Sequence, residues 1–115
     1  MQASTLAIVV VAVLHIGFFV LESVLWTSPK VMRLFGTTEE DAQATRVLAL
    51  NQGFYNLGAA ALLLVFHTTD NTVGVMGVLL FLAGMGLVGA VTANWRIILC
   101  QSLPAIAAFL LLYTV

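Results

Sequence analysis

Long apolar runs alternate with short polar stretches along the whole chain, and these runs predict helices that cross a membrane. The first run extends from about Thr5 to Trp26, and further runs follow after each polar interruption. A helix needs about 20 residues to cross the hydrocarbon core of a bilayer. We therefore predict four spans, at about 5–26, 46–67, 73–92 and 97–115.

The segment between the first two runs predicts a short helix in the membrane interface. Ser28 suits the N-cap position, Pro29 suits the first helical position and Gly36 is a typical stop. Lys30 and Arg33 are interleaved with apolar residues, as expected of a helix that lies at the membrane surface. The alternative for this segment is an irregular loop.

The acidic segment 37–41 predicts where the next helix begins. Its threonines can cap free amides, and Glu39, Glu40 and Asp41 suit the positive end of a helix dipole. These acids therefore have a structural explanation that needs no substrate. We expect one helix from near Glu39 to about His67.

Small residues dominate the third span. Gly86 with Ala90, and Gly89 with Ala93, form pairs spaced one helical turn apart, which lets another helix approach closely. We interpret this span as a packing helix.

Composition supports the same class of protein. Hydrophobic residues make up 62% of the chain and charged residues 8%, which leaves too little polar surface for a soluble domain. The sequence predicts an all-α, integral membrane four-helix bundle, formed as a single domain over residues 1–115. The net charge of −1 does not favour a nucleic-acid partner.

The basic residues predict the orientation. Lys30, Arg33 and Arg46 lie between or beside the first two spans, and Arg96 lies between the last two. Because cytoplasmic connections carry an excess of Lys and Arg, both termini are expected outside the cytoplasm. Cys100 is the only cysteine, so no internal disulfide is possible.

One polar segment lies inside an apolar span and predicts a functional or packing site. It reads Asn51-Gln52-Gly53-Phe54-Tyr55-Asn56. Unsatisfied polar groups are costly in hydrocarbon, so partners are expected on other spans. The candidates for binding a ligand or a proton are Glu22, His15, Asn51, Gln52, Tyr55, Asn56 and Gln101.

Depth along the helices arranges these candidates in two layers. With about 1.5 Å of rise per residue, one layer lies roughly 6 to 9 Å inside the cytoplasmic boundary. It contains Glu22, Asn51, Gln52 and Gln101. His15 and Asn56 fall about 15 Å deep, with Tyr55 just short of them. If the polar faces of the first two spans meet, they form a pocket open to the cytoplasm.

Glu22 is the sharpest candidate in this pocket. A carboxyl group within a membrane span indicates a functional site by default. Desolvation favours its neutral form, so it could exchange a proton. The structural alternative is a protonated Glu22 held by Asn51 or Gln52. His15 is either a proton relay or a neutral side chain bonded to Asn56. Pro104 frees the carbonyl of Cys100, which indicates a kink or a binding element.

These residues together carry a resemblance. They are Leu14-His15, Glu22 and Trp26, Arg33-Leu34-Phe35-Gly36, the segment 51–56, and Gln101 with Pro104. The chain resembles an uncharacterised bacterial family of small four-span membrane proteins that is classed as a domain of unknown function. The resemblance implies the fold and a location in the bacterial inner membrane, and it brings no established activity.

Three functions fit the sequence. The first is a pocket that binds a small amphipathic molecule and transports it with a proton carried by Glu22, in a homodimer or higher homo-oligomer. The second is an enzyme, an isomerase or hydrolase, in which Glu22, His15 and Tyr55 act as acid and base on a lipophilic substrate. The third is a structural subunit that recruits a protein partner. No metal or cofactor is predicted, although a haem shared between subunits stays open.

Overall fold

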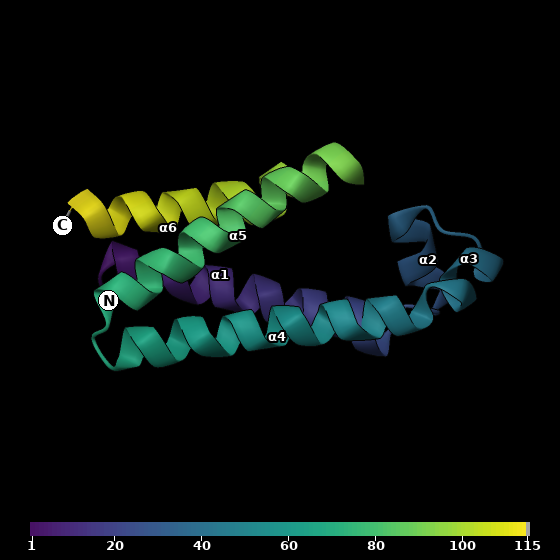
Figure 1. Cartoon of the computed structure of the whole chain (residues 1–115), viewed down its shortest axis with the longest axis horizontal. Coiled ribbons are helices and arrows are strands. Elements are labelled where there is room, and N and C mark those ends of the chain that lie inside the picture. The colour runs from purple at the N-terminus through teal and green to yellow at the C-terminus, as the bar shows by residue number, and fades with distance from the viewer. Residues whose placement is uncertain (115) are drawn as a thin grey trace. The chain divides into compact units, whose positions relative to one another are not determined.

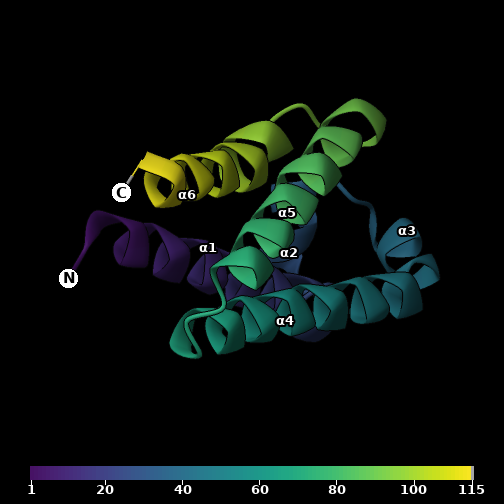
Figure 2. The ribbon, with the colours of Figure 1, turned by 60° about the vertical axis from the view of Figure 1, so that its left-hand side comes forward.

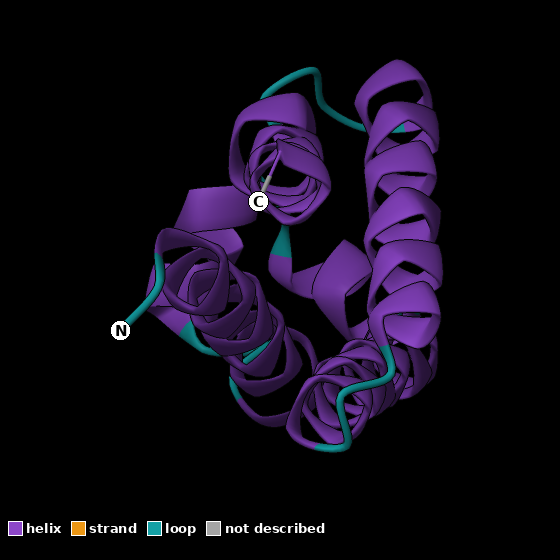
Figure 3. Cartoon of the chain, turned by 90° about the vertical axis from the view of Figure 1, so that its left-hand side faces the viewer, coloured by secondary structure: helices purple, strands orange, loops and turns teal. Residues whose placement is uncertain are grey.

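The computed structural model describes residues 1–114, which form helices joined by turns and loops, with no strand among them (Figure 1, Figure 3). Val115, the last residue of the predicted fourth span, lies outside the described residues. In chain order the elements are α1 (Ala3–Phe19), the π-helical turn η1 (Val20–Val24), α2 (Pro29–Phe35), α3 (Glu39–Ala44), α4 (Arg46–Thr68), α5 (Thr72–Thr92), the π-helical turn η2 (Ile98–Ser102) and α6 (Leu103–Thr114).

The chain forms two compact units. The first unit comprises Met1–Leu14 and Ala59–Val115, and the second comprises His15–Gly58. Helices α1 and α4 each contribute residues to both units.

The first unit has an apolar core built from four helical segments. Small residues of α1, α4 and α6 pack with larger side chains in this core. Its buried members are Ile8, Val11, Ala12, Ala60, Leu63, Val75, Leu79, Leu82, Ala83, Ala105 and Ala108. A short turn joins α4 to α5, and α5 and α6 then run in opposite directions against each other (Figure 2). Asn71 caps the first turn of α5 by accepting a hydrogen bond from the amide of Gly74 at 2.9 Å.

Glycines of α5 allow the chain's own η2 to approach closely. A Cβ atom at Gly86 would collide with Ser102 Oγ and would lie 3.1 Å from the Ser102 amide nitrogen. Ser102 Oγ donates to the carbonyl of Ala83 at 2.9 Å, and Gln101 Nε2 donates to the carbonyl of Leu82 at 3.0 Å. The packing face predicted at Gly86 is therefore occupied within the first unit. Gln101 helps to hold this contact.

Pro104 follows the η2 turn directly. Proline has no amide hydrogen, so it cannot donate to the carbonyl one turn earlier, that of Cys100. The amide of Leu103 instead donates to the carbonyl of Ile98, five residues back, which widens the helix by one residue. The expected disturbance at Pro104 thus takes the form of a π-helical turn.

The second unit contains η1, α2, α3 and the first part of α4. The predicted helix between the first two spans is confirmed as α2, with Ser28 Oγ accepting from the Val31 amide at 3.3 Å. Gly36 ends it in the left-handed conformation, at φ 66° and ψ 30°. The Thr37 amide then donates to the carbonyl of Met32 at 2.8 Å, which closes the helix end.

The helix expected to run unbroken from Glu39 to His67 is interrupted at Thr45. This residue has φ −100° and ψ 5°, and it separates α3 from α4. Thr45 Oγ1 donates to the carbonyl of Asp41 at 2.7 Å and accepts from Trp26 Nε1 at 3.1 Å. The interruption thus coincides with a side-chain contact between Thr45 and Trp26. Thr38 caps α3 as expected, by accepting from the Asp41 amide at 3.1 Å.

Three helical segments of the described chain are long and apolar enough to cross a membrane. They are Ala3–Val24, Arg46–Thr68 and Thr72–Thr92. The segment Ile98–Thr114 is apolar but shorter. The first three lie within two residues of the predicted spans at each end, and the fourth predicted span corresponds to this shorter segment.

Candidate functional site

The site in the second unit is organised around the close approach of η1 and α4 at Gly53. A Cβ atom at Gly53 would collide with Ser23 Oγ and would lie 3.0 Å from both Ser23 Cβ and the Ser23 amide nitrogen. Ser23 Oγ donates to the carbonyl of Leu50 at 2.8 Å, which ties the two backbones together. Glycine is therefore required at position 53 by close backbone packing.

Glu22 is bound by Asn56, which is not the partner expected from depth. Asn56 Nδ2 donates to Glu22 Oε1 at 2.7 Å, and the Asn56 side chain is 9% exposed. The depth estimate counts residues from Trp26 on the first span and from Arg46 on the second, so it treats these two residues as level with each other. The contact between Gly53 and Ser23 sets a register about one helical turn away from that assumption. Asn56 therefore comes within reach of Glu22 and takes the place assigned to Asn51 or Gln52.

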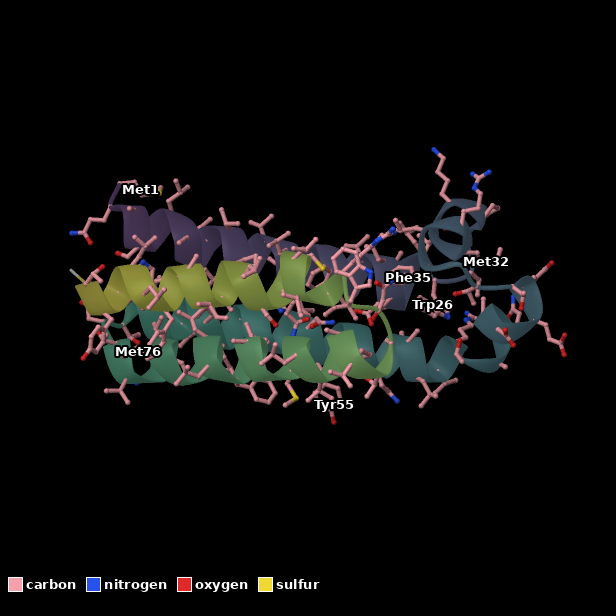
Figure 4. All side chains as sticks on the ribbon, turned by 90° about the horizontal axis from the view of Figure 1, so that it is seen from above. Met1, Trp26, Met32, Phe35, Tyr55 and Met76 are labelled. Carbon is pink, nitrogen blue, oxygen red and sulfur yellow. The ribbon has the colours of Figure 1, made fainter. Side chains whose placement is uncertain are left out.

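The other polar residues of the 51–56 segment do not face η1. Gly53 and Asn56 lie three residues apart and share the buried face of α4, whereas Asn51, Gln52 and Tyr55 are exposed. Tyr55 is 77% exposed and points away from the ribbon (Figure 4). Of the polar side chains in this segment, Asn56 is therefore the one that meets the first span, at Glu22. The roles of the exposed side chains in binding stay predictions.

His15 lies at the start of the second unit and is buried. Its side chain is 1% exposed, and its ring packs edge-on against Phe18 at 5.0 Å between centroids. One turn further on, Phe19 makes a similar edge contact with Phe54 of α4 at 5.1 Å. Asn56 uses one amide hydrogen for Glu22, and its pairing with His15 stays a prediction.

Trp26 connects the end of η1 to two other parts of the second unit. Its indole Nε1 donates to Thr45 Oγ1 at 3.1 Å. Its ring lies against Phe35 of α2, with 5.2 Å between ring centroids (Figure 4). These contacts hold the Trp26 side chain in one place beside Glu22 and Ser23.

A pocket of about 300 Å³ opens between η1 and the beginning of α4. We name it the Glu22 pocket. It is lined by Glu22, Ser23, Val24, Trp26, Thr27, Arg46, Val47 and Leu50. Its wall thus combines one acid, one base and two hydroxyls with aliphatic and aromatic surface.

Several lining residues were not among the sequence candidates. Ser23 and Arg46 stand next to the expected site but were assigned to no pocket, and Trp26 was not named as a binding candidate. A glycine such as Gly53 within a membrane span favours close packing against a small residue on a neighbouring helix, and this rule could have pointed to Ser23. Gln101, which was expected in the Glu22 layer, forms its hydrogen bond within the first unit.

The chemistry of the Glu22 pocket suits binding by hydrogen bonds and charge. Asn56 occupies Glu22 Oε1, and Glu22 Oε2 has no protein partner among the described residues. Within residues 1–114, no group of three or more His, Cys, Asp or Glu side chains is close enough to hold a metal ion. The described side chains that line the pocket therefore bring a carboxylate, a guanidinium and hydroxyl groups to a partly apolar space.

Comparison with known proteins gives one match. No curated protein and no solved structure is similar to this chain. The sequence profile of a family described as a protein of unknown function, DUF1304, matches residues 9–113. This match covers the second unit, most of the first unit and all the residues of the Glu22 pocket. The chain belongs to the DUF1304 family.

Proposed function

We propose that the protein is a small polytopic membrane protein that binds a small amphipathic molecule in the Glu22 pocket. The observation that carries this proposal is the composition of the pocket wall. Glu22, Ser23 and Arg46 offer polar contacts, while Trp26 and Leu50 offer apolar ones. A wall that combines placed polar groups with apolar surface is typical of small-molecule sites.

The proposal places the protein in a bacterial inner membrane as a four-span bundle. The three long apolar helices support membrane insertion, and Lys30, Arg33, Arg46 and Arg96 support an orientation with both termini outside the cytoplasm. In this orientation the Glu22 pocket lies in the cytoplasmic half, because Arg46 is one of its lining residues.

We further propose that Glu22 couples the movement of the ligand to a proton. A carboxyl group in a membrane helix is costly to ionise unless it has a partner, so ligand and proton can compete for it. Asn56 donates to one carboxylate oxygen and leaves the other for this exchange.

Transport of this kind needs a second bundle, and we propose that it is a second copy of the chain. Alternating access commonly moves one bundle or repeat against another. Asn51, Gln52 and Tyr55 are exposed on α4, and amide or hydroxyl groups within the membrane favour contact with another helix.

The experiment is native mass spectrometry with an absorption spectrum on protein purified in mild detergent. We expect a bound amphipathic molecule on the wild type that is reduced at least tenfold in Glu22→Gln. Glu40→Gln is the matched control, because Glu40 is exposed on α3 and does not line the pocket. Absence of any bound molecule from the wild type, even after exposure to membrane extract, would contradict the proposal.

Proton coupling has its own test in liposomes. The ligand identified by mass spectrometry is applied across a membrane with an imposed pH gradient. We expect wild type to accumulate it, Glu40→Gln to match the wild type, and Glu22→Gln to lose the dependence on the gradient. Unchanged coupling in Glu22→Gln would show that Glu22 does not carry the proton.

A further inference from the structure

An acidic and a basic side chain line the Glu22 pocket without pairing to each other. Glu22 and Arg46 both belong to its wall, and no ion pair joins them among the described residues. We infer that the pocket binds a zwitterionic amphiphile, whose ammonium group meets Glu22 and whose phosphate or carboxylate group meets Arg46. This inference rests on the proposed function, because it names the chemical class of the ligand of that same pocket.

The remaining hydrogen-bonding capacity of both side chains supports this assignment. Asn56 donates to Glu22 Oε1, and Glu22 Oε2 keeps its lone pairs for an ammonium donor. The Arg46 guanidinium, with its fork of N–H donors, suits a phosphate or carboxylate. Arg46 is exposed whereas Glu22 is half-buried, so the anionic group lies at the mouth of the pocket and the ammonium lies deeper.

A ligand with a single charge fits less well. An ammonium amphiphile would satisfy Glu22 but would bring a second positive charge toward Arg46. An anionic amphiphile would satisfy Arg46 but would oppose ionisation of Glu22 and leave its free oxygen without a cationic partner. Like charges are costly where water is partly excluded, whereas a zwitterion pairs both side chains at once.

The apolar part of the wall supplies a place for a hydrocarbon chain. Val24, Val47 and Leu50 line the pocket and are also 64%, 68% and 40% exposed. They therefore extend the pocket wall onto the outer surface of the helices. Trp26 adds an aromatic face, which attracts ammonium groups.

The size of the pocket limits how much of such a molecule it holds. Its volume of about 300 Å³ lies at the lower end of small-molecule sites, which span roughly 300 to 1,000 Å³. A head group and the beginning of one chain suit this volume better than a whole two-chain lipid. The same zwitterionic chemistry is found in a lysolipid and in a free head group, and the experiment separates these sources.

Trp26 provides a local reporter of binding. The chain has two tryptophans, and Trp95 is exposed and belongs to the first unit. A Trp95→Phe background therefore makes the fluorescence of the purified, full-length protein report on Trp26. The titrants are lauroyl lysophosphatidylethanolamine, dodecylamine, dodecyl phosphate, dodecyl maltoside and free phosphoethanolamine.

The expected result is selective, saturable binding of the zwitterion. We expect the lysolipid to bind about tenfold more tightly than dodecylamine or dodecyl phosphate, and dodecyl maltoside to give no saturable change. Free phosphoethanolamine that binds as tightly as the lysolipid would confirm the zwitterionic site and identify a soluble ligand as its source. Weaker binding of phosphoethanolamine would confirm a lipid source.

Two substitutions test which side chain pairs with each charged group of the ligand. Glu22→Gln should weaken the binding of the lysolipid and of dodecylamine about tenfold. It should not weaken the binding of dodecyl phosphate. Arg46→Gln should weaken the binding of the lysolipid and of dodecyl phosphate about fivefold. It should not weaken the binding of dodecylamine. Arg96→Gln is the matched control, since this exposed arginine does not line the pocket, and it should change none of these affinities.

Two outcomes would overturn the inference, and they differ in what they say of the proposed function. Equal binding of charged and neutral amphiphiles would reject the zwitterion while keeping an amphiphile pocket. The same conclusion would follow if Glu22→Gln and Arg46→Gln each weakened the binding of dodecylamine alone. No saturable binding of any titrant would reject both. Because Arg46 is exposed, Arg46→Gln should fold normally, which a circular dichroism melt verifies, so the test does not depend on the stability of Glu22→Gln.

Discussion

At the scale of single residues, the site depends on a hydrogen bond between two polar side chains on neighbouring helical segments. Asn56 is buried and donates to Glu22, whereas Asn51 is exposed on the same helix. The sequence placed both asparagines in polar layers but could not tell which of them meets Glu22. The choice depends on the rotation and register of α4, and these follow from packing at Gly53.

The two asparagines should differ in their effect on stability. We expect Asn56→Leu to lower the free energy of unfolding by about 1–3 kcal/mol, because it leaves the Glu22 carboxyl without its buried partner. Asn51→Leu should change it by less than about 0.5 kcal/mol, as for other surface substitutions. Denaturant titration in detergent micelles, followed by circular dichroism, measures both. Equal effects of the two substitutions would contradict the assigned pairing.

At the scale of elements, the helices and several of their ends could be predicted from the sequence, while the break at Thr45 and the π-helical turns could not. Ser28 and Gly36 mark the ends of α2, because capping and left-handed stops are local properties of the chain. At the break, Thr45 accepts a hydrogen bond from Trp26, which is distant in sequence, and a local pattern does not predict such a contact. A π-helical turn also has no general signature, although Pro104 is a cause for η2.

The packing of η1 against α4 gives a paired prediction for two glycines of α4. A Cβ at Gly53 would collide with Ser23, whereas a Cβ at Gly58 would meet nothing within 4 Å. Gly53→Ala should therefore destabilise the protein by about 1–3 kcal/mol, since it overpacks the contact. Gly58→Ala should stabilise it by about 0.5–1 kcal/mol, because alanine loses less backbone entropy in a helix. The same denaturant titration compares them.

A double mutant tests the cause of the Gly53 effect. Ser23→Ala removes the Oγ atom that a Cβ at position 53 would strike, while the Ser23 Cβ and amide nitrogen remain. The cost of Gly53→Ala should therefore be smaller in the Ser23→Ala background, by about 0.5 kcal/mol or more. Simple additivity of the two substitutions would show that Gly53 is required for another reason.

At the scale of the whole molecule, the number of membrane crossings depends on the last helical segment. Ile98–Thr114 is apolar, but its length of about 25 Å is shorter than the hydrocarbon core of about 30 Å. The charge pattern places Arg96 on the cytoplasmic side, so the predicted fourth crossing leads from there to the outside. A segment this short must thin the bilayer locally, or be lengthened by flanking residues such as Ile97, to cross.

Cysteine labelling distinguishes four crossings from three. In a Cys100→Ser background, single cysteines replace Lys30, Thr69 or Asn94, which are all exposed, or follow Val115 in a short extension. With an impermeant maleimide on intact bacterial spheroplasts, we expect Thr69→Cys and the extension to react, and Lys30→Cys and Asn94→Cys to react only after permeabilisation. An extension that behaves like Asn94→Cys would mean that Ile98–Thr114 does not cross. The reverse pattern at all four positions would mean that the few basic residues do not set the orientation, and the Glu22 pocket would then open to the outside of the cell.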